Sequence, residues 1–170
     1  YFEDEFGFFN TNITVTGWDY HVRNTAFRGD APEFTFVLET EADAIAYAQG
    51  FVDDTLTPVP EFSTIERISD GHFVVAPTMS IQLAVDAAPV SGTVEVGAGS
   101  YTEQVEIAKD LTLQGAGVGS TTIVAPPNGM TDFFTTSIDN YPVVYVHDAN
   151  DVTVRDLTVD GDEQGNLNHR

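Results

Sequence analysis

The chain has 170 residues, of which 27 are acidic and six basic, and its formal net charge is −21 at pH 7. This charge disfavours nucleic acid and anionic lipid as partners, because either polyanion would meet a strongly negative protein. The hydrophobic fraction of 42% is too high for an acidic disordered tail, and no apolar run is long enough for membrane insertion. The lack of cysteine excludes disulfides and thiolate chemistry.

The acidic, lysine-poor composition also indicates where the protein works. A carboxylate-rich surface keeps a protein hydrated and dispersed through self-repulsion, and salt or calcium screens that repulsion. We therefore expect a secreted protein, extracellular or on the cell surface. The chain starts at Tyr1 without Met and shows no signal peptide, which indicates a mature or excised product.

Residues 1–60 are predicted to form a small mixed α/β appendage. Strand-like composition and then helical periodicity mark three segments, at residues 12–15, 34–38 and 41–52. Thr40 is placed to cap the expected helix. The run Thr57-Pro58-Val59-Pro60 can neither continue a helix nor lie in a central strand, so we place a domain boundary near residue 60.

Residues 61–170 predict one short helix followed by many short strands. Residues 80–88 have apolar side chains at the spacing of one helical face, and Ser80 can cap them. The strand-like segments that follow are separated by glycines and acidic residues and lie at residues 93–96, 104–107, 111–113, 122–124, 143–146, 152–154 and 157–159.

An Asp-aliphatic-Thr-aliphatic pattern recurs in these strands, starting at Asp110, Asp151 and Asp156. Gly115 and Gly161 follow the first and third copies at the same distance. We interpret the distance between these two copies as two turns of a solenoid with coils of roughly 20–25 residues, whose strands pair in parallel. A two-sheet sandwich is the alternative, which explains the short strands but neither the repeat nor the leading helix.

Residues 80–124 resemble the start of right-handed parallel β-helix proteins of the pectin-lyase-like superfamily. The resemblance rests, in chain order, on the helix at 80–88, the strand after Gly92, the run Gly99-x-Tyr101-x-Glu103 and the run Asp110-Leu111-Thr112-Leu113-Gln114-Gly115. Residues 150–161 are similar to the repeat found throughout such proteins. The resemblance implies a mostly β fold, with about three coils of a right-handed parallel β-helix over residues 61–170 and the short helix capping its first coil.

Gly99-x-Tyr101-x-Glu103 also matches part of the first signature of the pectinesterase branch. An active member of the superfamily would be a polysaccharide lyase or a carbohydrate esterase on uronic-acid polymers. In the pectinesterase branch the catalytic residues lie on later coils, and no later motif of this chain matches them, so no catalytic residue is assigned. Glu103 is placed to hold a backbone amide or a hydroxyl, and the alternative for Tyr101 and Glu103 is a corner of the scaffold.

Calcium is the inorganic partner that the sequence favours. The run Asp160-Gly161-Asp162-Glu163-Gln164-Gly165 is similar to the start of a calcium loop, with oxygen ligands at alternate positions. It predicts Asp160, Asp162 and Gln164 as ligands. The alternative is a solvated corner after a strand.

Aromatic and histidine side chains give two further candidates. Trp18 and Tyr20, with Tyr47, are predicted to form a carbohydrate-binding platform, and packing in the core is the alternative. His147 follows a strand and lies at a corner, where a solvated histidine is the alternative to a catalytic one.

Two functions remain open from the sequence. The first is a β-helix module that interacts with polysaccharide, without a complete active site in this chain. The second is a structural or adhesive subunit that self-associates by stacking open β-helix ends into fibres or oligomers. The second rests on the last coil near Arg170, which either more chain or another subunit must cover.

Overall fold

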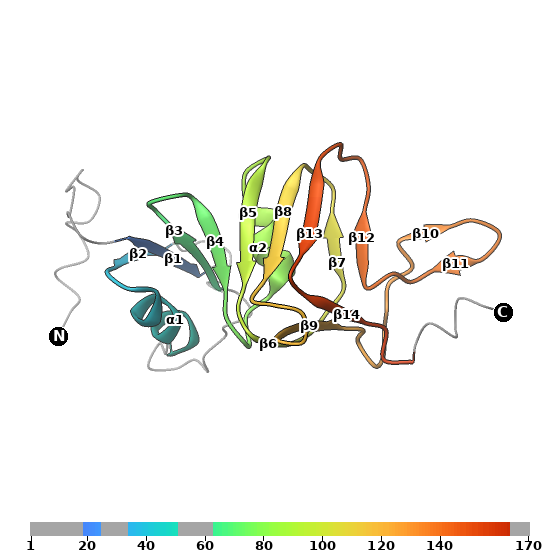
Figure 1. The fold of residues 1–170 in the computed structure, drawn as a ribbon, viewed down its shortest axis with the longest axis horizontal. Coiled ribbons are helices and arrows are strands. Elements are labelled where there is room, and N and C mark those ends of the chain that lie inside the picture. Colours follow the sequence, from blue (N-terminus) through green and yellow to red (C-terminus); the bar gives the residue numbers. More distant parts are fainter. Residues whose placement is uncertain (1–18, 25–33, 51–62, 164–170) are drawn as a thin grey trace.

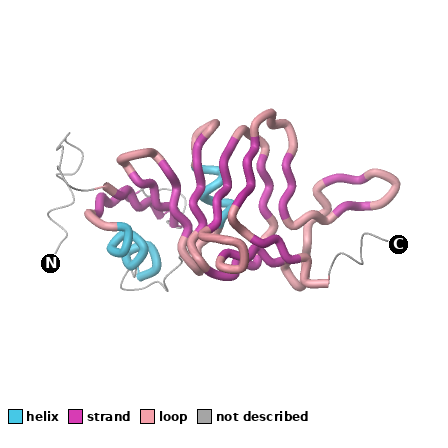
Figure 2. The backbone as a smooth tube through the Cα atoms, viewed as in Figure 1, coloured by secondary structure: helices cyan, strands magenta, loops and turns pink. Residues whose placement is uncertain are grey.

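The computed structural model describes residues 19–24, 34–50 and 63–163. This part of the chain is mostly β, with two helices (Figure 1, Figure 2), and neither helix combines the length and hydropathy of a membrane span. The elements are β1 Tyr20–Asn24, β2 Phe34–Leu38, α1 Glu41–Gly50, β3 Ser63–Arg67, β4 His72–Val75, α2 Ile81–Ala87, β5 Gly92–Val96, β6 Gly99–Thr102, β7 Val105–Ile107, β8 Leu111–Gly115, β9 Thr121–Val124, β10 Phe134–Thr135, β11 Asp139–Asn140, β12 Val144–Val146, β13 Val152–Arg155 and β14 Thr158–Asp160.

The N-terminal elements form the antiparallel end of a mixed, seven-stranded sheet. Its strand order is β13-β8-β5-β4-β3-β1-β2, and the β4–β3, β3–β1 and β1–β2 pairs are antiparallel. Helix α1 begins where the sequence predicts, because the Asp43 amide donates to Thr40 Oγ1 at 3.1 Å. The sheet crosses the boundary expected near residue 60, since β1 pairs along its whole length with β3.

Arg67 joins this antiparallel end to the parallel strands that follow. Its guanidinium lies 2.7 Å from the Asp70 carboxylate and 3.0 Å from the Glu95 carboxylate. Glu95 also contacts His72 Nδ1 at 2.7 Å. Because Arg67 lies on β3, His72 on β4 and Glu95 on β5, the cluster ties three neighbouring strands together on one face of the sheet.

From β5 onward the chain passes through three sheets in a repeated order. The first pass runs through β5, β6 and β7, the second through β8, β9 and β12, and the third through β13 and β14. Each strand of the second and third passes pairs in parallel with the corresponding strand one pass earlier. Within the described residues, the one antiparallel pair after β4 is the β10–β11 hairpin, which Figure 1 shows projecting away from the sheets.

The parallel register accounts for the repeated Asp-aliphatic-Thr-aliphatic pattern. Leu111 lies opposite Val152 and Leu113 opposite Val154, so the copies at Asp110 and Asp151 align in successive passes. The third copy belongs to the same pass as the second, because its strand, β14, pairs with β9. The expected spacing of two turns between the first and third copies is therefore wrong. The insertion that contains the β10–β11 hairpin lengthens the second pass, so the distance between the copies in the sequence suggests two turns where the chain makes one.

Alternation along the strands fills the space between the three sheets with aliphatic side chains. In β8, for example, Leu111 and Leu113 are buried while Thr112 between them is partly exposed. Burying a leucine or isoleucine contributes about 1.5–3 kcal/mol each, so these columns supply most of the stability of this part. Helix α2 packs its buried Ile81 and Val85 toward β3, β4, β5 and β7 and so covers the first pass.

The last strands of the three sheets, β12, β13 and β14, leave an aliphatic layer open at the other end of the sheets. Three side chains there are exposed although their partners in the register, Ile107, Leu113 and Ile123, are completely buried. The three, with their exposed fractions, are Val146 43%, Val154 38% and Val159 47%. We call them the open end.

The corner between β13 and β14 requires a glycine in the pass before it. A β-carbon built on Gly115 would lie 2.7 Å from the Leu157 β-carbon and closer still to the Asp156 carbonyl oxygen. We expect Gly115→Ala to lower the free energy of unfolding by about 1–3 kcal/mol, the usual cost of overpacking. Urea unfolding followed by circular dichroism measures the change.

The control for this substitution is Ala116→Ser at the exposed neighbouring position. Its free energy of unfolding is expected to stay within about 0.5 kcal/mol of that of the unaltered protein. If Gly115→Ala is as stable as that control, the close approach of the corner to β8 is wrong.

Candidate functional site

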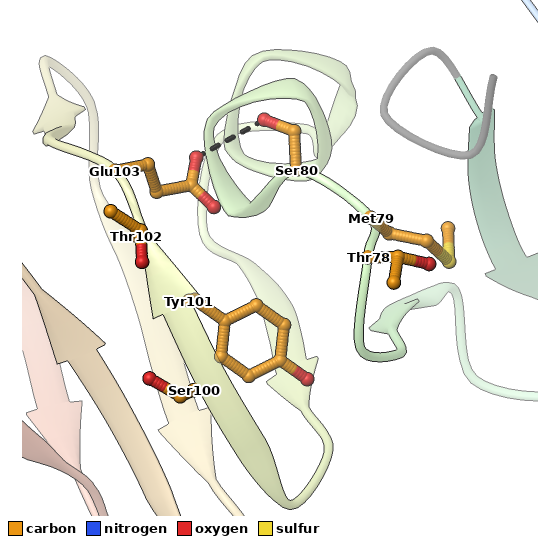
Figure 3. A pocket seen from close by; sticks show the side chains of 7 residues that line it. All are labelled: Thr78, Met79, Ser80, Ser100, Tyr101, Thr102 and Glu103. Atoms are coloured by element: carbon orange, nitrogen blue, oxygen red, sulfur yellow. Dashed lines mark hydrogen bonds between the residues drawn. The ribbon is translucent and has the colours of Figure 1, made fainter. Parts of the chain in front are cut away.

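An open hollow of about 320 Å³ lies beside the start of α2 (Figure 3). Seven residues line it: Thr78, Met79, Ser80, Ser100, Tyr101, Thr102 and Glu103. The hollow thus contains two side chains of the Gly99-x-Tyr101-x-Glu103 signature, and their contacts decide what it can do.

The Glu103 carboxylate caps helix α2 from the first pass. One oxygen accepts the Ile81 amide at 2.8 Å, and the other accepts the Gln82 amide and the Ser80 hydroxyl, both at 3.1 Å. Backbone amides in the first turn of a helix have no intrahelical partner, and a negative charge there is favourable. The prediction that Glu103 holds a backbone amide or a hydroxyl is confirmed, and its role is to hold the scaffold together.

Tyr101 also belongs to the scaffold. Its side chain is buried, and its hydroxyl lies 3.0 Å from the Gly97 carbonyl oxygen and 3.3 Å from that of Val75. Burial raises the pKa of Tyr101 to about 12, and the negative charge of Glu103 adds to the shift. The phenol therefore stays protonated at neutral pH and directs its proton to backbone carbonyl oxygens, so both signature side chains are engaged by the scaffold.

The residues expected to bind calcium lie after β14. Asp160 and Asp162 are both exposed, and Asp160 Oδ1 accepts the Asp162 amide at 2.9 Å, as in a solvated turn. Gln164 lies outside the described residues. Over residues 19–24, 34–50 and 63–163, no three His, Cys, Asp or Glu side chains are grouped to hold a metal ion. Calcium stays a prediction from the sequence.

The prediction that Tyr20 belongs to a carbohydrate-binding aromatic platform is wrong. This ring is 9% exposed and belongs to the core, and its hydroxyl donates to the Glu41 carboxylate at 3.3 Å. It therefore offers no open face to a sugar, because the ring is packed within the hydrophobic core. Trp18 and the side chain of Tyr47 lie outside the described part of the chain.

The outer face of the β7–β12 sheet carries a row of stacked rings that the sequence did not predict. Tyr145 stacks on Phe133 and on Phe134, with ring centroids 5.2 Å apart in each pair, and on His147 at 4.7 Å. We call these four residues the aromatic row. The row points outward, because Val105, opposite the neighbouring Val144, is completely buried.

Both ring nitrogens of His147 contact carboxylates. Nε2 lies 2.7 Å from Glu106 Oε1, across the parallel strand pair, and Nδ1 lies 2.9 Å from Asp148 Oδ2. Two acceptors require two N–H donors, which only the imidazolium has. Asp148, and after it Glu106, raise the pKa of His147 above its ordinary value.

Gln104 positions the segment that carries Phe133 and Phe134. Its side-chain amide donates to the Thr131 and Pro142 carbonyls at 3.1 and 2.9 Å, and its oxygen accepts the Thr131 amide at 2.6 Å. One side chain on the first pass therefore holds both ends of the insertion that contains β10 and β11. The rings of the insertion are consequently fixed against Tyr145 before any ligand binds.

The aromatic row suits binding better than catalysis. A histidine whose two nitrogens are both held by carboxylates is not free to take a proton from a nucleophile. Phe134 is 39% exposed and the Asp148 side chain 86%, so the row presents both an apolar and a hydrogen-bonding surface to solvent. The period-two spacing of Tyr145 and His147 was visible in the sequence, but their partners depend on the register and on the insertion.

Comparison of the chain with protein-family models, with characterised proteins and with solved structures finds no match. The functional argument therefore rests on the sequence and on the geometry of the described residues.

The His147 contacts predict a pH-dependent contribution to stability. Because the folded-state pKa is raised, the contribution is fully present below the ordinary histidine value of about 6.5 and is lost as the pH rises through the folded-state value. The difference in unfolding free energy between the unaltered protein and His147→Gln should therefore be larger at about pH 5.5 than at about pH 9.

Urea unfolding at each pH measures this difference, and the NMR titration of the His147 ring gives the pKa directly. Glu106→Gln serves as the partner variant and is expected to lower that pKa. A difference that does not change with pH contradicts the assignment of an imidazolium.

Proposed function

We propose that the described chain belongs to a secreted or cell-surface parallel β-helix that binds polysaccharide through the outer face of the β7–β12 sheet. Three parallel sheets visited in a repeated order, with successive passes in register, support the β-helix. The position of α2 beside the first pass and the sequence resemblance of residues 80–124 support it too. No catalytic residue is part of the proposal.

The aromatic row is the observation that carries the polysaccharide proposal. Sugar rings bind proteins through C–H groups packed on aromatic side chains and through hydroxyls that bond to nearby polar groups. The row offers Phe134 and Tyr145 beside the carboxylates of Glu106 and Asp148. Because stacking and Gln104 hold the row in advance, binding costs little conformational entropy.

The direct test is the affinity of Tyr145→Ala for polysaccharides that the unaltered protein binds, measured by affinity electrophoresis and isothermal titration calorimetry. Loss of the central ring should weaken binding about two- to tenfold, the equivalent of an aromatic contact of about 0.5–1.5 kcal/mol. Val118→Ala is the control, because Val118 is an exposed apolar residue, 79% accessible, in the β8–β9 connection. Binding that Tyr145→Ala leaves intact would contradict the proposed face.

The open end favours a second candidate function, self-association by stacking of β-helix ends. Val146, Val154 and Val159 would be covered by a further layer of aliphatic side chains, as their buried partners are in the earlier passes. The β13 edge would also gain a partner for its free backbone groups. A second copy can supply both, although the net charge of −21 opposes the contact at low salt.

Sedimentation and light scattering over a concentration series at high salt test this second candidate. We expect oligomers that grow with concentration and that Val154→Asp returns to monomers, because a charge at the open end cannot be buried unpaired. Val118→Asp adds the same charge at another exposed valine and should leave the oligomers unchanged. A monomer at every concentration would rule out stacking.

A further inference from the structure

The permanent cations among the described side chains all have hydrogen-bond acceptors in the scaffold. Arg67 lies in the cluster with Asp70 and Glu95 and is 19% exposed. Lys109 donates to the carbonyl oxygens of Asp86 and Ala88 at the end of α2. These two cations therefore already serve the scaffold.

Arg155 completes this set of cations and lies on a different sheet from the row. Its guanidinium donates to Gln114 Oε1 at 2.6 Å, on the face of the seven-stranded sheet. Each of the three permanent cations whose side chains are described, Arg67, Lys109 and Arg155, is therefore held by groups of the scaffold rather than by the rings of the aromatic row.

The charges at the row itself are negative in sum. Glu106 and Asp148 contribute two carboxylates, and the His147 imidazolium balances one of them. A ligand carboxylate about 4 Å from the exposed Asp148 would meet a repulsion of about 1 kcal/mol in water, and the net charge of −21 adds to it. Every acidic sugar along the row would add a similar penalty.

We infer that the polysaccharide recognised by the aromatic row is uncharged, with neither carboxylate nor sulfate groups. This inference rests on the proposed function, and it differs from the uronic-acid polymers that the family resemblance implies. Aromatic rings and hydrogen-bond acceptors serve an uncharged sugar chain fully, because its hydroxyls can donate to Glu106 and Asp148.

Pairs of polysaccharides that share a backbone and differ in charge test the inference. Suitable pairs are methyl-esterified and de-esterified homogalacturonan, propylene glycol alginate and alginate, and hydroxyethyl and carboxymethyl cellulose. At low salt the uncharged member should bind at least about fivefold more tightly, the equivalent of one such repulsion. The difference should shrink as added salt screens it.

Two substitutions test whether the preference for uncharged polysaccharide arises at the aromatic row. Asp148→Asn removes the exposed carboxylate beside the aromatic row. It should reduce the difference in affinity between the uncharged and the acidic member of each pair. Glu39→Gln removes one carboxylate charge from an exposed position between β2 and α1 and should leave the difference in affinity unchanged.

The possible outcomes separate this inference from the proposed function. Equal or tighter binding of the acidic members, with or without added calcium, overturns the inference and leaves polysaccharide binding standing. A preference that Asp148→Asn does not alter also overturns it, because the repulsion would then arise elsewhere. If no member of any pair binds, both the inference and the proposed function are wrong.

Discussion

In-register parallel pairing between successive passes is the constraint on which the rest of the structure depends. With Leu111 opposite Val152 and Leu113 opposite Val154, every aliphatic residue of the pattern shares one face and every threonine the other. A shift of one residue in the register would move every buried side chain of a strand to the solvent face, so burial of the aliphatic side chains fixes the register. The same pairing sets Tyr145 opposite Glu106, which brings His147 within reach of that carboxylate. Core and candidate site thus follow from one geometric rule.

The elements that the sequence predicted well are those with local causes. Helix α2 follows from apolar spacing and from Ser80, whose hydroxyl accepts the Leu83 amide at 3.1 Å. The strands of the repeated pattern follow from alternation alone. Strands β3 and β4 escaped prediction because their Arg67 and His72 are stabilised by Glu95, which is distant in the sequence. The spacing of the passes was misjudged because the insertion has no periodicity in the sequence that distinguishes it from the parallel strands.

The candidate site was the least predictable part, and for the same physical reason. Its rings come from the insertion and from β12, while Gln104 and Glu106, which hold them, come from the first pass. Contacts between residues so far apart in the chain leave no periodic pattern in the sequence from which they could be predicted. Glu103 was foreseen as a residue that holds an amide or a hydroxyl only through the Gly99-x-Tyr101-x-Glu103 run, because its partners at the start of α2 lie more than 20 residues earlier in the chain. Tyr20 could not be placed, since an aromatic residue in a strand suits either a core or a surface.

Hydrogen bonds from the Gln104 side chain connect the insertion to the first pass. Both ends of the segment that carries the β10–β11 hairpin are bonded to one glutamine, so we expect that the segment can change in length or sequence while the parallel strands stay in place. The residues between Thr131 and Pro142 can therefore be exchanged as one unit, with the contacts of Gln104 marking where the exchanged segment begins and ends.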